Sequence, residues 1–130
     1  MIPILVDSCI YISYLKRKID VRQLLVPALR SGRLYNCGVV RAEVLRGIRE
    51  EKFYSEVEEF FDIIPEVPAD AKIWRQVSRL AWQAARNGLA PPTTDFVIAA
   101  CAMRVRATVI TLDKHFNQIP GVTVSAELPL

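Results

Sequence analysis

The stretch from Thr93 to Asp113, TTDFVIAACAMRVRATVITLD, constrains the fold more than any other part of the sequence. Its first half is apolar on nearly every side and predicts a buried helix, capped by Thr93 or Thr94 and with Asp95 in its first turn. The β-branched run 108–112 is typical of a strand covered on both faces, and it stops at Asp113. A helix of about twelve residues rises roughly 18 Å, and a strand of about five residues rises roughly 17 Å. We therefore expect Asp95 and Asp113 to return to the same edge of a parallel sheet, where α/β proteins bind ligands.

The composition fits one domain spanning residues 1–130. The hydrophobic content of 52% is spread along the chain, and no apolar run approaches the roughly 20 residues of a membrane span. The start of the chain has neither the basic region nor the cleavage site of a signal peptide. Three scattered cysteines and one histidine exclude the usual zinc spacings and predict buried thiols in a reducing cytoplasm. A net charge of +3 permits a polyanionic partner without requiring one.

The rest of the chain alternates short apolar runs with helical periodicity. The predicted strands are 3–6, 34–37, a short one that 63–64 lead into between Pro65 and Pro68, 108–112 and 122–124. The predicted helices are 10–18, 21–31, 39–50, 53–61, 70–87, 93–106 and a short turn at 116–119. This alternation predicts a three-layer α/β/α sandwich with a mainly parallel central sheet of about five strands. Right-handed crossovers then bring every strand's carboxyl end to one edge.

Four acidic residues are expected at that edge: Asp7, Glu43, Asp95 and Asp113. Each has a simple structural explanation by itself, as a helix cap or as a charge that complements a helix dipole. Together they repel one another unless a cation lies among them, and a set of oxygen ligands favours Mg²⁺ or Mn²⁺. Such an ion activates water and neutralises phosphate oxygens, which indicates metal-dependent cleavage of a phosphodiester. A phospho-acceptor receiver domain also groups acids here, but it needs a lysine at a strand end that this sequence lacks.

Four segments in register resemble the PIN domain, and specifically the VapC-type toxins of bacterial and archaeal toxin–antitoxin pairs. They are ILVDSCIYISYL, VVRAEVLRGI, TTDFVIAACA and VITLDKHFNQIPGV, which together run along nearly the whole length. The resemblance implies a ribonuclease whose Mg²⁺ or Mn²⁺ site is formed by Asp7, Glu43, Asp95 and Asp113. It also implies an RNA substrate, a cognate antitoxin peptide lying across an apolar groove, and a homodimer.

Residues beside these acids are candidates for supporting roles. By resemblance, Ser8 and Thr111 hold a carboxylate or a metal-bound water, although a cap and a strand residue explain them equally well. His115 takes a place where many members carry a further acid, which leaves a second metal position open. Arg41, Lys114 and His115 are candidates for contacting RNA phosphates, and solvated surface is the alternative for each.

The aromatic residues of the helices at 10–18 and 53–61 exceed what one core face needs, which indicates an exposed groove. Trp82 lies off the apolar stripe predicted for its helix and is a candidate interface residue. That stripe comprises Ile73, Trp74, Val77, Ala81, Ala84 and Ala85. Two other functions stay open: a PIN-like module that binds RNA or protein without cutting, and a nuclease that processes nucleic acid without being a toxin.

Overall fold

A single five-stranded sheet forms the centre of the computed structural model, which describes residues 2–128. The strand order is β3-β2-β1-β4-β5, and all four neighbouring pairs are parallel. The strands are β1 (Ile4–Val6), β2 (Leu34–Cys37), β3 (Glu66–Val67), β4 (Thr108–Ile110) and β5 (Thr123–Ser125). The predicted parallel α/β architecture with about five strands is confirmed.

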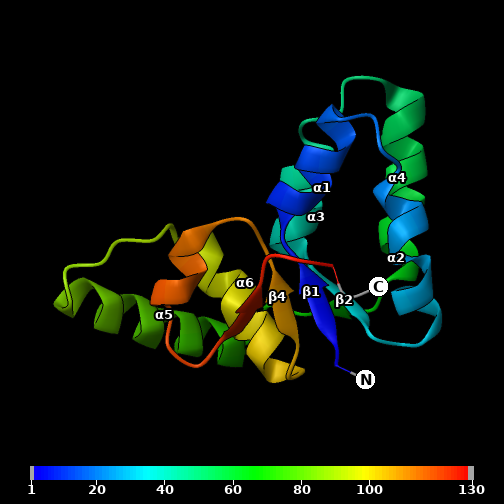
Figure 1. Ribbon diagram of the computed structural model, residues 1–130. Helices are drawn as coiled ribbons and strands as arrows, with labels where there is room; N and C mark the ends of the chain where they lie inside the picture. Colours follow the sequence, from blue (N-terminus) through cyan, green and yellow to red (C-terminus); the bar gives the residue numbers. More distant parts are fainter. Residues whose placement is uncertain (1, 129–130) are drawn as a thin grey trace.

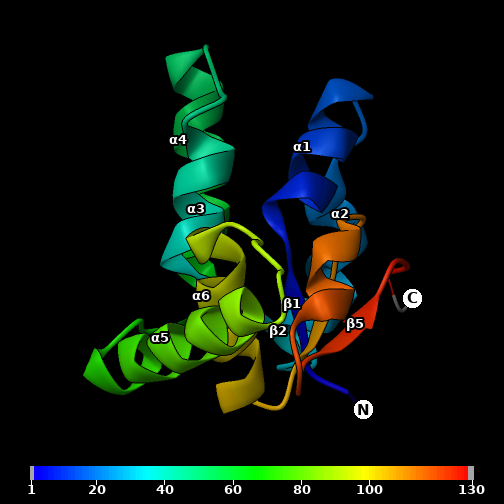
Figure 2. The same ribbon diagram turned by 90° about the vertical axis from the view of Figure 1, so that its left-hand side faces the viewer.

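Helices cover both faces of this sheet and complete the predicted three layers. They are α1 (Ser8–Lys16), α2 (Val21–Arg30), α3 (Gly38–Leu45), α4 (Glu51–Ile63), α5 (Ala71–Arg86), α6 (Thr93–Arg104) and the 3₁₀ helix η1 (Lys114–Gln118). Figure 1 shows α1 and α4 rising above the sheet while α5 extends to the left. Figure 2 shows α1 and α2 on one side of β1 and β2, and α5 and α6 on the other. Among the described residues, no helix combines the length and apolarity that a bilayer crossing requires.

The core centres on β1 and α6. All three residues of β1 are buried, and Ile4, Leu5 and Val6 pair with Thr108, Val109 and Ile110 of β4. Every residue of α6 from Asp95 to Ala102 is buried as well. The alanines of α6 have no exposed surface, so the helix packs closely between the sheet and α5, with which it makes the most extensive helix contact. The central strand and this helix therefore hold Asp7 and Asp95 on well-packed elements.

Several element boundaries differ from those predicted. Helix α3 ends at Leu45 instead of residue 50, because the chain turns through Gly47 before α4 begins. Strand β4 ends at Ile110 instead of residue 112, although the backbone N–H of Thr111 still donates to the carbonyl of Ser125. The predicted threonine cap of α6 is wrong: Pro92 occupies the N-cap position and the helix starts at Thr93 without a side-chain cap. Gly88, at φ +72°, ends α5 as predicted, in a left-handed conformation that glycine adopts without strain.

The apolar stripe of α5 was predicted only in part. Ile73, Val77 and Ala84 are buried, but Trp74 and Ala85 are exposed. Leu80 takes their place in the buried face. The regular spacing of 73, 77, 80 and 84 follows the seam against α6, and the tryptophan falls just outside it.

Enlarging a buried alanine of α6 tests how tightly this layer is packed. We expect Ala99→Leu to lower the free energy of unfolding by about 1–3 kcal/mol, since it adds three carbons where no space is free. Ala85→Leu makes the same change on the exposed face of α5 and should shift stability by about 0.5 kcal/mol or less. Urea denaturation measures both, and equal effects would contradict the packing described for α6.

Candidate metal and catalytic site

The four predicted acids lie on four different elements at the carboxyl edge of the sheet. Asp7 follows β1 and caps α1, Asp95 is in the first turn of α6, and Asp113 caps η1. Glu43 is in the second turn of α3 and not in the first turn as predicted, because the helix starts at Gly38. A helix dipole therefore does not explain Glu43. Asp7 and Asp95 are only 5% and 8% exposed, which is unusual for carboxylates.

Thr111 links two of these acids. Its Oγ1 donates a hydrogen bond of 2.7 Å to Oδ2 of Asp7, and it accepts one of 2.9 Å from the backbone N–H of Asp113. The other oxygen of Asp7 accepts from the backbone N–H of Ser8 at 2.8 Å. Thr111 directly follows β4, the neighbour of β1, and its backbone N–H still donates to the carbonyl of Ser125 in β5. Its hydroxyl thus sets the orientation of the Asp7 carboxylate and the start of the Asp113 loop.

Ser8 connects Asp7 to Glu43. Its Oγ lies 3.0 Å from Oε1 of Glu43, to which it donates, and 3.4 Å from Oδ1 of Asp7. Ser8 and Glu43 are 35 residues apart in sequence, so this bond fixes α3 against the start of α1. The predicted neighbours Ser8 and Thr111 both contact the carboxylate of Asp7.

Asp95 is the electrostatically costly member of the group. Burial, together with the negative charges of Asp113, Asp7 and Glu43, raises its pKa from 3.8 to about 6, and His115 only partly offsets this. Its Oδ2 is buried and accepts no hydrogen bond from any described residue. A buried carboxylate oxygen without a donor, surrounded by other carboxylates, is an atom that a bound cation would satisfy.

His115 lies against the acids. Its Nδ1 is 3.2 Å from Oδ1 of Asp113 and 3.9 Å from Oδ2 of Asp95. One ligand atom from each of these three residues lies within 4.8 Å of the other two, a spacing that can hold a divalent ion. The sequence predicted an RNA contact for His115; the structure places the imidazole beside two proposed metal ligands.

Cys9 is a neighbour of this site that the sequence analysis missed. Its thiol donates to Oδ2 of Asp7 at 3.2 Å, lies 3.3 Å from Oγ1 of Thr111, and accepts from the backbone N–H of Leu112 at 3.4 Å. Burial raises the pKa of Cys9, so the thiol stays protonated and continues to donate. Its position two residues after Asp7 in the first turn of α1 was the available signal. The prediction of buried thiols holds for Cys37 and Cys101, whereas Cys9 is partly exposed.

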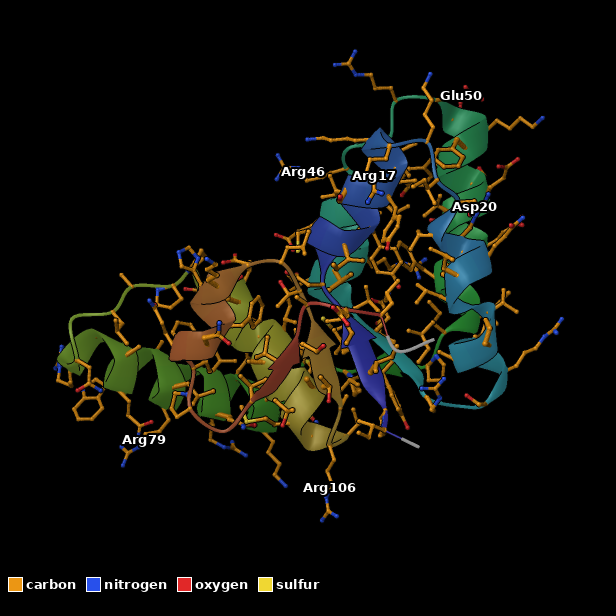
Figure 3. The ribbon with its side chains drawn as sticks, viewed as in Figure 1. Arg17, Asp20, Arg46, Glu50, Arg79 and Arg106 are labelled. Carbon is orange, nitrogen blue, oxygen red and sulfur yellow. The ribbon has the colours of Figure 1, made fainter. Side chains whose placement is uncertain are left out.

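The predicted basic neighbours have different surroundings. Arg41 forms ion pairs with Asp62 at 2.6 Å and Glu58 at 3.9 Å, so its guanidinium is directed to α4. Lys114 is exposed at the start of η1. Arg46 is also exposed, and Figure 3 shows it projecting from the end of α3 near Arg17. Of these three residues, Lys114 is adjacent in sequence to a proposed ligand and has no ion pair within the described part of the chain.

Comparison with known proteins decides the family. The model of the PIN domain matches residues 4–122, which include all four acids. The chain belongs to the PIN domain family. A search of curated proteins finds no match. The resemblance predicted from the four sequence segments is therefore confirmed at the level of the family.

Solved structures share this PIN fold over nearly the whole chain. DNA-bound VapBC from Salmonella typhimurium matches with a TM-score of 0.80 and 21% identity, covering 96% of this chain and 98% of that one. VapBC2 from Rickettsia felis, bound to a promoter DNA fragment, matches with a TM-score of 0.78 and 20% identity, with the same coverage. VapBC-5 from Mycobacterium tuberculosis, a member of the VapBC family of toxin–antitoxin systems, has a TM-score of 0.61 and 22% identity, covering 93% and 94%. These likenesses establish the common fold.

The raised pKa of Asp95 predicts a pH-dependent cost to stability. Below about pH 4 the carboxyl group of Asp95 is mostly protonated in both the folded and the unfolded state. It then does not lower the free energy of unfolding. Between about pH 4 and pH 6 the folded PIN domain retains the proton that the unfolded chain has lost, so its stability falls over this range, by up to about 3 kcal/mol, and stays at the lower value at higher pH. Asp95→Asn should therefore match the wild type near pH 4 and exceed its melting temperature by several degrees near pH 7.5, in EDTA.

The exposed Glu59→Gln is the matched control and should change stability little at either pH. Thermal unfolding followed by circular dichroism measures all three proteins. A difference between wild type and Asp95→Asn that is the same at both pH values would contradict the assignment of the cost to this carboxylate.

Proposed function

We propose that this PIN domain is an endoribonuclease that depends on Mg²⁺ or Mn²⁺ and acts as the toxin of a VapBC-type toxin–antitoxin pair in the cytoplasm. The observation that carries the proposal is the convergence of four carboxylates around the unsatisfied Oδ2 of Asp95. Four carboxylates on separate elements repel one another, and this arrangement becomes stabilising only when a cation binds among them. The structural likeness to VapBC proteins supports the toxin assignment.

The donor set fits a hard divalent ion. Asp7, Asp95 and Asp113 would hold it, with Glu43 acting directly or through water, and the nitrogen of His115 is compatible with Mn²⁺ as a second candidate. When bound, the ion lowers the pKa of a coordinated water and offsets charge that develops on the phosphodiester. The substrate bond would be the phosphodiester of RNA, attacked in line at phosphorus.

The residues of the chain supply orientation and a proton acceptor. Thr111 and the Ser8 backbone hold both oxygens of Asp7, so that carboxylate does not rotate during the reaction. The hydroxyl of Ser8 donates a hydrogen bond to Oε1 of Glu43. The other oxygen, Oε2, is therefore the atom that would accept a proton from the attacking water. The burial of Asp7 and Asp95 excludes bulk water from one side of the site and strengthens its electrostatics.

Removing one carboxylate charge tests this mechanism. We expect Asp7→Asn and Asp95→Asn each to reduce Mn²⁺-dependent cleavage of single-stranded RNA by about a hundredfold or more, because each removes an anionic ligand while keeping the side-chain volume. Glu59→Gln on the exposed face of α4 removes the same charge and should leave cleavage unchanged. Gel analysis of labelled RNA and circular dichroism of the proteins separate loss of activity from loss of fold.

Two results would contradict the proposal. Cleavage that persists in both Asn variants would exclude these acids as ligands. A wild-type protein that binds RNA but never cuts it, with either metal, would favour the non-catalytic module.

An apolar groove lies between α1, the end of α3 and the start of α4. It encloses about 700 Å³, and its floor is formed by Ile12, Leu15, Val44, Ile48 and Phe53. Its rim carries three basic side chains and one acidic one: Lys16, Lys18, Arg49 and Glu50. Of the aromatic residues considered for such a groove, Phe53 lines it, whereas Tyr11, Phe60 and Phe61 are in the core. An apolar floor with a basic rim suits an amphipathic segment that carries acidic side chains. We propose the cognate antitoxin as its occupant.

A charge placed in this groove tests the antitoxin assignment. Ile48→Asp should weaken binding to the cognate antitoxin by about a hundredfold, because it buries a carboxylate against the apolar segment. Ile63→Asp introduces the same charge at an exposed position of α4 and should leave binding intact. Co-purification and calorimetry measure binding, and both variants should still cut RNA. Equal binding by both variants would place the antitoxin elsewhere.

A further inference from the structure

The outward face of α5 carries a continuous basic stripe. Lys72, Arg75, Arg79, Trp82 and Arg86 follow one another at alternating spacings of three and four residues, which align them along one face of a helix. We call these five residues the α5 stripe. The opposite face, formed by Ile73, Val77, Leu80 and Ala84, packs into the core. Figure 3 shows Arg79 directed outward from α5, away from the rest of the molecule.

No acidic residue neutralises the α5 stripe locally. The sequence has no Asp or Glu between residues 71 and 94, so the helix carries four positive charges in a protein whose net charge is +3. Three arginines elsewhere in the chain are paired: Arg22 with Asp20, Arg41 with Asp62, and Arg104 with Asp70. Within residues 2–128, none of the stripe's basic side chains forms an ion pair at 4.0 Å or less. The positive field of this face is therefore available to a partner.

Trp82 adds an aromatic surface to this charge. Its side chain is 53% exposed, and the guanidinium carbons of Arg79 and Arg86 lie 5.6 Å and 5.3 Å from the ring centroid. An exposed indole held between two arginines offers flat cationic and aromatic groups side by side. Surfaces that bind single-stranded nucleic acid combine these two features, because phosphates pair with the arginines and bases stack on the planar groups.

We propose that the α5 stripe is a second contact surface for single-stranded RNA, separate from the acids at the sheet edge. It spans about 21 Å along the helix, which is long enough for several consecutive phosphates. This inference rests on the proposed function in one respect, the choice of RNA as the polyanion. The stripe holds a flanking part of the RNA and takes no part in cleavage, so it affects long substrates and not short ones.

A second copy of the chain fits the α5 stripe less well. Its occupant would need a free acidic surface, and the densest group of acids in the described structure is on α4. Glu56, Glu58 and Asp62 of that helix already face Arg22 or Arg41 of their own chain. Part of the charge of α4 is therefore offset within its own chain, and an external polyanion, which carries a charge on every phosphate, complements the stripe better.

The test is RNA binding by the full-length protein without cleavage. The probe is a fluorescein-labelled oligouridylate of about 20 nucleotides in EDTA, followed by fluorescence anisotropy over a range of salt concentrations. Arg75→Gln with Arg79→Gln should weaken binding by about tenfold and reduce the slope of log K against log salt by about 1.4, since each phosphate contact to a single strand contributes about 0.7. Trp82→Leu should weaken binding by about fivefold without changing the slope.

The matched control removes the same charge from the other side of the sheet. Arg30→Gln with Arg33→Gln, at the end of α2, should keep the affinity within about twofold of the wild type. Wild-type affinity and slope in the Arg75/Arg79 variant would overturn the proposal. So would unchanged RNA binding accompanied by a change from dimer to monomer in sedimentation, which would make the stripe a protein interface.

Cleavage is measured separately, on a tetranucleotide, which limits contacts beyond the acids. The stripe variants should cut it as the wild type does, whereas slower cleavage of the tetranucleotide would overturn the separation of the two sites. If the wild type cut no RNA but the stripe variants still lost binding, the proposed nuclease function would fail and the stripe would stand. The two proposals therefore fail in different experiments.

Discussion

Mutual repulsion among four carboxylates is the constraint on which the rest of this structure depends. The protein brings Asp7, Glu43, Asp95 and Asp113 to one sheet edge, and the cost appears in the pKa of Asp95, raised to about 6. Hydroxyls offset part of that cost: Thr111 and Ser8 donate to Asp7 and Glu43. Nothing in the described structure donates to Oδ2 of Asp95. The proposed positive ligand would satisfy that atom, and the buried β1 and α6 hold Asp7 and Asp95 in place beside it.

Negative and positive charge are concentrated on two different surfaces, the sheet edge with the four acids and the α5 stripe. Arg22 and Arg41 face three acids of α4, so part of the negative charge of this helix is offset within the chain. The α5 stripe has no such partners among the described residues. The sheet edge is acidic and the outward face of α5 is basic. This division suits an enzyme that binds a polyanion on one surface and places one of its phosphates at the other. The apolar groove beside α1 offers a third surface, which is available to a regulatory partner.

Much of the fold and the residues of the site could be predicted from the sequence, because their signals are local. The β-branched run before Asp113 and the apolar helix after Asp95 identify a parallel α/β unit, and parallel strands bring their carboxyl ends together by topology. The predictions that were wrong concern contacts between elements, which the spacing of residues in the sequence does not determine. Gly47 ends α3 early, Pro92 replaces a threonine cap, and Arg41 turns to Asp62 because α4 packs beside α3. The contacts of Cys9 and His115 with the acids arise from loop geometry after β1 and β4.

The central claim is that the four acids bind a cation. Calorimetric titration of the metal-free protein with Mn²⁺ at neutral pH tests it most directly, because it measures cation binding without requiring a substrate. The structure predicts saturable binding of at least one ion per chain, with affinity that weakens as the pH falls below about 6 and Asp95 becomes protonated. Binding should raise the melting temperature in step with its saturation. A titration that shows no binding at neutral pH would contradict the account, and the convergence of the four acids would then have to be explained without a metal.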